Sequence, residues 1–342
     1  MARCLIGCGS NLGKRREQLD RAVELLRFMP GVTLQAVSRF RETLPVGGPE
    51  GQGAYLNGAC LLETDLPPQD VLDMLLAVEN TLLRERRERW GERTVDLDLL
   101  LYDDLVVDSP ALTLPHPRMA TRRFVLEPCV EIAGELAFPV AACTLRDLLD
   151  NISVPHPFVA VVGVPGSGAA EVAAAVADAT VSRLVTAPSP LPAADTDASA
   201  WEATLDAWAQ PLHAGDWELE PHGVVADFWL DALPLAAVGD LPAAAHERFD
   251  RVCRRIAATA VAPHVAILLV TDAATIAARL AAEGTSPAGE TDRLMRIQER
   301  LVRRLRCPGE RAPRAPKAVV PIDARDLGRA VAEATAAVEA ML

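Results

Sequence analysis

Residues 94–102 read Thr-Val-Asp-Leu-Asp-Leu-Leu-Leu-Tyr, and their first half alternates between polar and apolar side chains. A period of two predicts a β-strand whose two faces differ. We expect Asp96 and Asp98 to share one face, and Leu97, Leu99 and Leu101 to point to the opposite, buried face. The segment therefore predicts a sheet with an apolar layer on its leucine side.

The paired carboxylates of this strand predict a cation site. Two adjacent carboxylates repel each other unless a cation lies between them. Hard oxygen ligands on a rigid strand suit Mg²⁺, which keeps several waters and adds the phosphates of a substrate. Taken alone, the pair is better explained as ordinary surface aspartates.

An arginine-rich segment precedes the strand: Arg84, Arg86, Arg87, Arg89 and Arg93. Guanidinium groups bind phosphate oxygens through paired hydrogen bonds, so the run favours recognition of a polyphosphate. A solvated helix end whose arginines complement the helix dipole is the simpler alternative. The arginine run and the carboxylate pair together favour the polyphosphate.

The order of expected elements in the first half is strand, helix, strand, strand, helix, strand. This order is typical of an antiparallel α+β sheet with helices on one face. The glycine and proline residues of 43–53 predict a mobile loop between two of the strands. The expected elements are strands at 2–8, 32–40, 55–64 and 94–102, and helices at 14–28, 67–86 and 121–132.

Length and composition limit the remaining possibilities. The chain has 342 residues, enough for two domains, with a boundary expected near 151–157. A net charge of −13 argues against general nucleic-acid binding. The seven cysteines form no CxxC pair and predict reduced, buried thiols. Because no apolar segment is long enough to span a bilayer, we expect a cytoplasmic protein with no membrane contact.

The second half begins with an apolar strand at 158–162, a glycine-rich turn and an alanine-rich helix. A strand, turn and helix of this kind form the context of a phosphate-binding loop. Gly163 and Gly168 have the spacing of GxxxxGK(S/T), but Ala169 and Ala170 replace the lysine and the hydroxyl residue. The apolar run at 265–270 predicts a buried parallel strand, and hence a doubly wound α/β fold. Residues 187–197 are rich in Pro, Ala and Asp and are expected to form a loop or a disordered insert.

The first half resembles the 6-hydroxymethyl-7,8-dihydropterin pyrophosphokinases over roughly residues 1–158. The segments that carry the resemblance are CLIGCGSNLG near the start, ETLPVGG at 42–48, AYLNGA at 54–59, RWGERTVDLDLL at 89–100, LTLPHP at 112–117 and TRRFVLEP at 121–128. The resemblance implies a ferredoxin-like α+β domain over residues 1–152. It also implies transfer of pyrophosphate from ATP to 6-hydroxymethyl-7,8-dihydropterin in folate biosynthesis, which leaves AMP.

Roles for single residues follow from this resemblance alone. Asp96 and Asp98 would hold two Mg²⁺ ions, and Arg84 and Arg93 would act in catalysis. His116, which lies between two prolines, would without the resemblance be a loop-bracing residue. Ala111 stands where some members of the family carry an arginine that contacts ATP. The residues that would contact ATP are Arg86, Arg89, Thr113, His116 and Arg122.

The resemblance also implies a pterin site. Tyr55 and Phe124 would sandwich the ring, although both would otherwise be read as core aromatics. Asn57 would pair with the donor and acceptor edge of the pterin, or tie down a turn as a buried amide. Glu79 matches a helix position that the family uses near the active site, and a solvated carboxylate explains it equally well. The other expected pterin contacts are Thr43, Leu44, Pro45 and Trp90.

The second half resembles the deoxynucleoside kinases in two segments, VVADFWLDALPL at 224–235 and PHVAILLVTDAATIAARL at 263–280. This resemblance implies a P-loop-kinase-like α/β domain over 158–342. The missing lysine predicts a non-catalytic domain, which could form a homodimer. Asp227 is a remnant of a motif near phosphate or a helix cap, and Arg279 is what remains of an arginine-rich lid. Two other functions stay open, namely a bifunctional enzyme that also phosphorylates deoxynucleosides and a non-catalytic scaffold that binds pterin or nucleotide.

Overall fold

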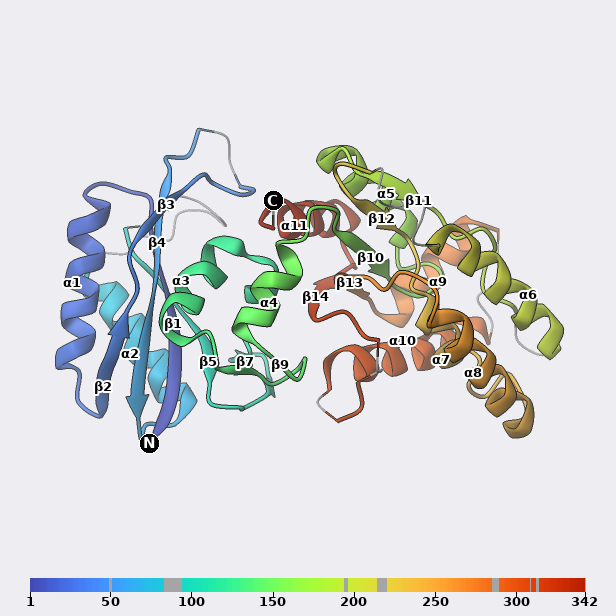
Figure 1. Ribbon diagram of the computed structural model, residues 1–342, viewed down its shortest axis with the longest axis horizontal. Coiled ribbons are helices and arrows are strands. Elements are labelled where there is room, and N and C mark those ends of the chain that lie inside the picture. Colours follow the sequence, from blue (N-terminus) through green and yellow to red (C-terminus); the bar gives the residue numbers. More distant parts are fainter. Residues whose placement is uncertain are drawn as a thin grey trace. The chain divides into compact units, whose positions relative to one another are not determined.

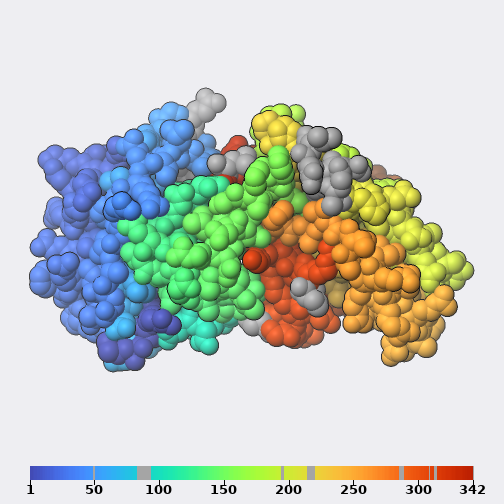
Figure 2. Space-filling view, in the orientation of Figure 1, coloured from blue at the N-terminus to red at the C-terminus, as the bar shows by residue number. Residues whose placement is uncertain are grey.

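The computed structural model describes residues 1–48, 51–82, 94–193, 196–213, 220–284, 289–307, 309–311 and 314–341. The chain forms two compact units (Figure 1). One comprises Met1–Asn151 with the chain end from Glu339, and the other comprises Ile152–Val338. Figure 2 gives the same view in space-filling form, with most of the first unit in blue to green and the second in green to red. The expected domain limits, 1–152 and 158–342, stay a prediction.

The first unit is built on a five-stranded antiparallel sheet. Four strands lie in the order β2-β4-β1-β5, and β3 also pairs with β4. The crossing order arises because each helical connection carries the chain past a neighbouring strand. The strands are β1 (Ala2–Ser10), β2 (Val32–Val37), β3 (Arg41–Thr43), β4 (Tyr55–Thr64) and β5 (Asp96–Tyr102).

The expected strand at 32–40 is interrupted. Ser38 is 5% exposed, and its hydroxyl accepts a hydrogen bond of 2.8 Å from the Ala59 amide. This side chain takes the place of a backbone partner, so β2 ends at Val37 and β3 begins only at Arg41.

Two helices cover one face of the sheet, α1 (Arg15–Phe28) and α2 (Pro68–Thr81). Leu19, Ala22 and Leu26 recur at helical spacing on α1 and are buried against β1 and β4 in one apolar cluster. Pro68 occupies the first turn of α2, where its missing N–H costs nothing. The helix is described as far as Thr81, and the expected continuation to Arg86 lies outside the described residues.

The expectation of helices on one face holds for α1 and α2, the two helices of the βαββαβ order, whereas α3 (Arg123–Ala133) lies elsewhere. Arg41 pairs with Asn57 in the sheet, so these side chains point away from the apolar cluster. Arg41 nevertheless forms ion pairs with Glu127 and Glu131 of α3. The helix therefore lies on the face opposite α1 and α2, beside β3 and β4 (Figure 1). Because α3 follows the last strand of the βαββαβ unit, that element order does not determine its side.

Strand β5 departs from strict alternation. The register shifts between Leu5 and Ile6, so that Ile6 pairs with Leu99 while Leu5 pairs with Leu101. Leu97 and Leu99 join the apolar cluster as expected. Leu101 shares the face of Leu5 instead, and the prediction for its side is wrong because one extra residue reverses the alternation.

Short elements complete the first unit after β5. The 3₁₀ turn η1 comes directly before α3, so the helix begins at Arg123 rather than Thr121. These elements are β6 (Val107–Asp108), β7 (Thr113–Leu114), η1 (Met119–Thr121), β8 (Ala137–Phe138), β9 (Cys143–Thr144) and α4 (Leu145–Ile152).

The second unit contains a parallel five-stranded sheet in the order β11-β12-β10-β13-β14. Every residue of β10 is buried, as its continuous apolar sequence predicts for a strand covered on both faces. The strands are β10 (Phe158–Val162), β11 (Arg183–Val185), β12 (Val224–Ala226), β13 (Val265–Val270) and β14 (Ala318–Asp323).

Helices surround this sheet in the alternating pattern of α/β proteins. In the described part of the chain no helix combines the length and apolar character needed to cross a bilayer. The helices are α5 (Ala169–Thr180), α6 (Ala198–Ala209), α7 (Leu233–Ala236), α8 (Ala243–Ala257), α9 (Ala273–Ala282), α10 (Glu290–Arg306) and α11 (Leu327–Glu339), with 3₁₀ turns η2 (Gln210–Leu212) and η4 (Leu230–Ala232).

Candidate active site

The sheet face that carries Asp96 and Asp98 has a regular arrangement across its strands. Gly9 of β1 pairs with Asn57 of β4 on one side and with Asp96 of β5 on the other. Gly7 pairs in the same way with Ala59 and Asp98. Paired residues in antiparallel strands point to the same face. Asn57 and the two carboxylates therefore share the face opposite the α1–α2 core.

The two glycines leave the strand between Asn57 and the aspartates without side chains. A Cβ atom on Gly9 would lie 3.1 Å from Oδ1 of Asn57 and 4.0 Å from Cβ of Asp96. Any other residue at position 9 would therefore push against the Asn57 side chain. Sequence reasoning did not identify Gly7 and Gly9 as site residues, although two glycines separated by one residue within a strand are a signal of a bare face.

The expected pterin residues of β3 and β4 are brought together. Thr43 pairs with Tyr55 in the sheet, and the Asn57 amide donates a hydrogen bond of 2.8 Å to the Thr43 hydroxyl. The Tyr55 hydroxyl donates to Gln52 Oε1 at 3.0 Å, and Asn11 donates to the same oxygen at 3.3 Å. Asn57 is 8% exposed and Tyr55 partly buried, so both side chains are held by protein contacts.

The groups expected to contact ATP lie close to Asp96. The His116 amide donates to the Leu100 carbonyl of β5 at 2.9 Å. The guanidinium of Arg122 lies 5.6 Å from the centre of the Phe124 ring. Arg122 and Asp96 both act electrostatically on His116, so the three side chains are neighbours. The structure therefore joins the carboxylate strand to the start of α3.

His116 is a neutral group in this environment. Burial lowers its pKa to about 3, and the positive charges of Arg122 and Arg118 act in the same direction. The Arg118 amide donates a hydrogen bond of 3.3 Å to Nδ1, so the ring proton resides on Nε2. The loop-bracing interpretation is thus correct for Nδ1, while Nε2–H remains a neutral donor suited to a phosphate oxygen.

Glu79 is not a solvated carboxylate. It is 1% exposed, on the inner side of α2, and its Oε1 accepts a hydrogen bond of 2.7 Å from the Leu97 amide. Leu97 stands between Asp96 and Asp98. Glu79 therefore fixes the backbone that carries the two carboxylates from the opposite face of the strand.

The remaining expected site residues are less closely joined to this arrangement. Leu44 is 80% exposed in the segment after β3, and Pro45 follows it with intermediate exposure. Thr113 lies in β7, opposite Asp108. Five expected residues lie outside the described part of the chain: Arg84, Arg86, Arg89, Trp90 and Arg93.

The donor set fits Mg²⁺. Asp96 and Asp98 provide hard oxygen ligands on the sheet face where the neighbouring Gly9 carries no side chain. No group of three or more potential metal ligands from His, Cys, Asp and Glu occurs among the residues that the structure describes. Two carboxylates alone would leave other positions to waters and phosphates, as is usual for this ion. A neutral imidazole donor and an arginine lie beside the pair, and groups of these kinds are the ones that bind phosphate oxygens.

Comparison with known proteins identifies the family. The family model described as 7,8-dihydro-6-hydroxymethylpterin-pyrophosphokinase matches residues 5–134. The 2-amino-4-hydroxy-6-hydroxymethyldihydropteridine pyrophosphokinase of Haemophilus influenzae is 40% identical over 139 residues, which are 41% of this chain and 86% of that protein. The enzyme of the same name from Bacillus subtilis is 44% identical over 131 residues, 38% of this chain and 78% of that protein. The chain therefore belongs to the hydroxymethyldihydropterin pyrophosphokinase family.

These similarities concern the first unit. A crystal structure of Plasmodium falciparum HPPK-DHPS matches 60% of this chain and 64% of its own, with a TM-score of 0.34 and 11% identity. A likeness this low carries no argument about either unit.

Proposed function

We propose that the first unit transfers pyrophosphate from ATP to 6-hydroxymethyl-7,8-dihydropterin and releases the pterin pyrophosphate and AMP, a step of folate biosynthesis. The observation that carries the proposal is the row Asn57–Gly9–Asp96 across three strands. It sets an amide that can recognise a heterocycle beside a carboxylate that can hold a metal-bound phosphate. The glycine between them allows Asn57 to approach the strand closely.

Asp96 and Asp98 would hold Mg²⁺, and two ions are proposed with ATP bound. Bound Mg²⁺ supplies charge neutralisation to the phosphates and lowers the cost of bringing the hydroxymethyl oxygen to the β-phosphorus. Positioning then accounts for much of the rate, because this chain supplies no covalent nucleophile in the transfer.

The pterin would lie between Tyr55 and Phe124. Tyr55 belongs to β4, and Phe124 belongs to α3, the helix that packs on the sheet face opposite α1 and α2. The Asn57 amide offers both a donor and an acceptor to the ring edge. Its hydrogen bond to the Thr43 hydroxyl fixes which atoms face the ligand. Backbone groups of Thr43, Leu44 and Pro45 would complete the pocket, with Trp90 above the ring.

The ATP phosphates would bind on the side of β5 and the start of α3. Nε2–H of His116 donates a hydrogen bond without adding charge, and Arg122 adds the positive charge. Thr113 would contact ATP from β7. Four arginines complete the proposed site, with Arg84 and Arg93 acting on the phosphates during transfer and Arg86 and Arg89 binding ATP.

Formation of AMP tests the proposal directly. The full-length protein with ATP, Mg²⁺ and the reduced hydroxymethyl pterin should form AMP only when the pterin is present, without ADP. Asp96→Asn and Asp98→Asn should each lower this rate by a factor of at least about 100, the scale on which misplaced groups affect transfer. Asp104→Asn, an exposed carboxylate close in sequence, should keep the rate. A folded Asp96→Asn protein with the wild-type rate would contradict the proposed metal site.

We also propose a ferredoxin-like fold for the first unit and a P-loop-kinase-like fold for the second. The βαββαβ order with strands arranged β2-β4-β1-β5 supports the first assignment. The succession of β10, a turn with glycines at 163, 166 and 168, and α5 supports the second.

The second unit is proposed to be non-catalytic. Ala169 and Ala170 supply neither the charge nor the hydroxyl that a phosphate loop needs. Arg279 donates to the carbonyls of Gly166 at 3.1 Å and Ser167 at 3.0 Å, and its other hydrogen bonds go to Ala324 and Arg325 carbonyls. It thus braces the turn. Asp227 is not a helix cap, because it accepts a hydrogen bond of 2.6 Å from the Ala187 amide.

A bifunctional enzyme is the competing function, and the full-length protein with ATP and each deoxynucleoside would test it. Deoxynucleoside monophosphate formation that persists in Asp96→Asn would overturn the non-catalytic assignment. A scaffold would bind pterin or ATP without turnover. A homodimer through the second unit also stays a proposal, which sedimentation of the full-length protein can test.

A further inference from the structure

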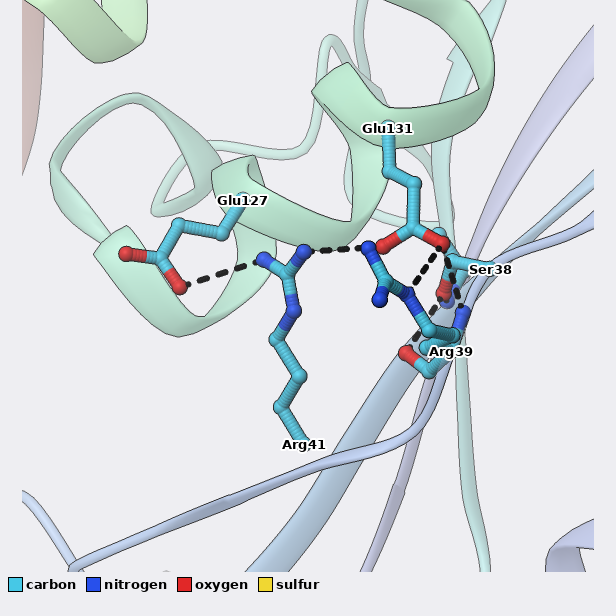
Figure 3. A network of polar contacts seen from close by, with 6 residues as sticks. Ser38, Arg39, Arg41, Glu127 and Glu131 are labelled. Carbon is cyan, nitrogen blue, oxygen red and sulfur yellow. Dashed lines mark hydrogen bonds and ion pairs between the residues drawn. The ribbon is translucent and has the colours of Figure 1, made fainter.

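A network of arginine and glutamate side chains joins β3 to α3 (Figure 3). Arg41 contacts Glu127 at 3.3 Å with one guanidinium nitrogen and Glu131 at 2.8 Å with the other. The backbone amide of Arg39 donates to Glu131 at 3.0 Å, and the Arg39 side chain contacts the same oxygen at 3.3 Å. Glu131 is therefore held at two points on the chain segment that leads into β3.

The network is well placed to act on the proposed pterin site. Phe124, Glu127 and Glu131 stand at spacings of three and four residues and so lie along one stripe of α3. Arg41 and Thr43 are two apart in β3 and share a face. The contact that locks Glu127 and Glu131 to Arg41 therefore also fixes how far Phe124 extends along β3 and β4, toward Thr43 and Tyr55.

We propose that Arg41 is a positioning residue for the pterin clamp, setting the register of α3 against β3 so that Phe124 lies opposite Tyr55. This inference rests on the proposed function of the first unit. A planar guanidinium can bind two carboxylates one helical turn apart, whereas an ammonium group cannot hold both in fixed directions. The contact of Arg41 with Glu127 and Glu131 thus constrains geometry as well as pairing opposite charges.

The environment favours the ionised form of Glu131. The side chains of Arg41, Glu127 and Glu131 are 35%, 36% and 22% exposed. The hydrogen bond from the Arg39 amide lowers the pKa of Glu131, and the charges of Arg39 and Arg41 add to this effect. Glu131 therefore stays negative through the neutral range, and the constraint does not switch with pH there.

Steady-state kinetics of Arg41→Gln separate positioning from general stability. We expect the KM for the pterin to rise about five- to tenfold, a ratio that corresponds to roughly 1–1.4 kcal/mol. The kcat should stay within about twofold, because Asp96 and Asp98 belong to β5 rather than to the displaced elements. Arg41→Lys should restore only part of the KM. The matched control is Arg146→Gln, which removes an exposed ion pair with Glu135 elsewhere in the unit and should leave KM unchanged.

A double-mutant cycle with Phe124→Leu tests the route of the effect. If Arg41 acts through Phe124, Arg41→Gln should change the KM by less than about twofold in the Phe124→Leu background. The same factor in both backgrounds, or a KM for Arg41→Gln equal to that of the Arg146→Gln control, would overturn the inference. Equilibrium binding of 6-hydroxymethylpterin, followed by its fluorescence, repeats the comparison without turnover. If the wild type fails to form AMP, the proposed function fails, while the binding ratio still decides the role of Arg41.

Discussion

Replacing Glu79 should disturb the metal-binding strand from behind. Its Oε1 accepts from the Leu97 amide at 2.7 Å, and the side chain is 1% exposed. Glu79→Leu keeps a similar volume but removes the acceptor, whereas Glu79→Gln keeps an acceptor oxygen. A buried donor left without a partner costs about 1–3 kcal/mol. The free energy of unfolding of Glu79→Leu should therefore lie about 1–3 kcal/mol below that of Glu79→Gln. In a unit of this size, each kcal/mol lowers the midpoint of thermal unfolding by roughly 2–4 °C.

Hydrogen exchange at the Leu97 amide measures this effect at its origin. Protection should fall roughly 5- to 150-fold in Glu79→Leu relative to Glu79→Gln, as the same range of free energy requires. Loss of a fixed Leu97 should also displace Asp96 and Asp98, so AMP formation should fall at least about tenfold between the same two variants. Equal exchange rates and equal kcat in Leu and Gln variants would refute the idea that Glu79 positions the strand.

Two further predictions concern a histidine and a buried arginine. His116 has a folded pKa of about 3, below the value of about 6.5 in unfolded chains, so its presence should destabilise the fold progressively as pH falls below about 6.5. The difference in unfolding free energy between wild type and His116→Asn, measured with urea, should therefore change only as the pH falls below about 6.5. A change in this difference between pH 7 and 8 would contradict the lowered pKa. Arg293 is 5% exposed and contacts Asp240 at 2.6 Å. Arg293→Met should lower the stability of the second unit by about 3–5 kcal/mol in a denaturant titration, whereas Arg303→Met, which removes an exposed pair at 3.9 Å, should cost less than about 0.5 kcal/mol.

Strand identity and facing follow from sequence wherever alternation is unbroken. The pattern of 94–102 predicted correctly that Leu97 and Leu99 enter the core, because side-chain direction in a strand depends only on residue parity. The prediction failed at Leu101, because the bulge opposite Leu5 and Ile6 depends on how β1 and β5 pair residue by residue. Such a match is a property of the pair of strands and cannot be read from either one.

Local pattern has a second limit at α3. The helix was expected from its sequence, but its position on the opposite face is seen only from contacts such as those of Arg41 with Glu127 and Glu131, which are far apart in sequence. Pairing of this kind becomes visible only when β3 and α3 are placed together. The parallel sheet of the second half was predicted because the continuous apolar run at 265–270 needs no distant partner to be recognised.

The residues that shape the candidate site are not all residues that would touch a substrate. Gly9 contributes space, and Glu79 holds a backbone amide from the far side of the strand. A motif search that asks for charged or aromatic side chains passes over both, because neither carries chemistry of its own to the ligand. Yet a side chain at position 9 would crowd the gap between Asn57 and Asp96, and loss of Glu79 would free the backbone on which Asp96 stands. The proposed transfer therefore depends on an empty position and a buried support as much as on the carboxylates themselves.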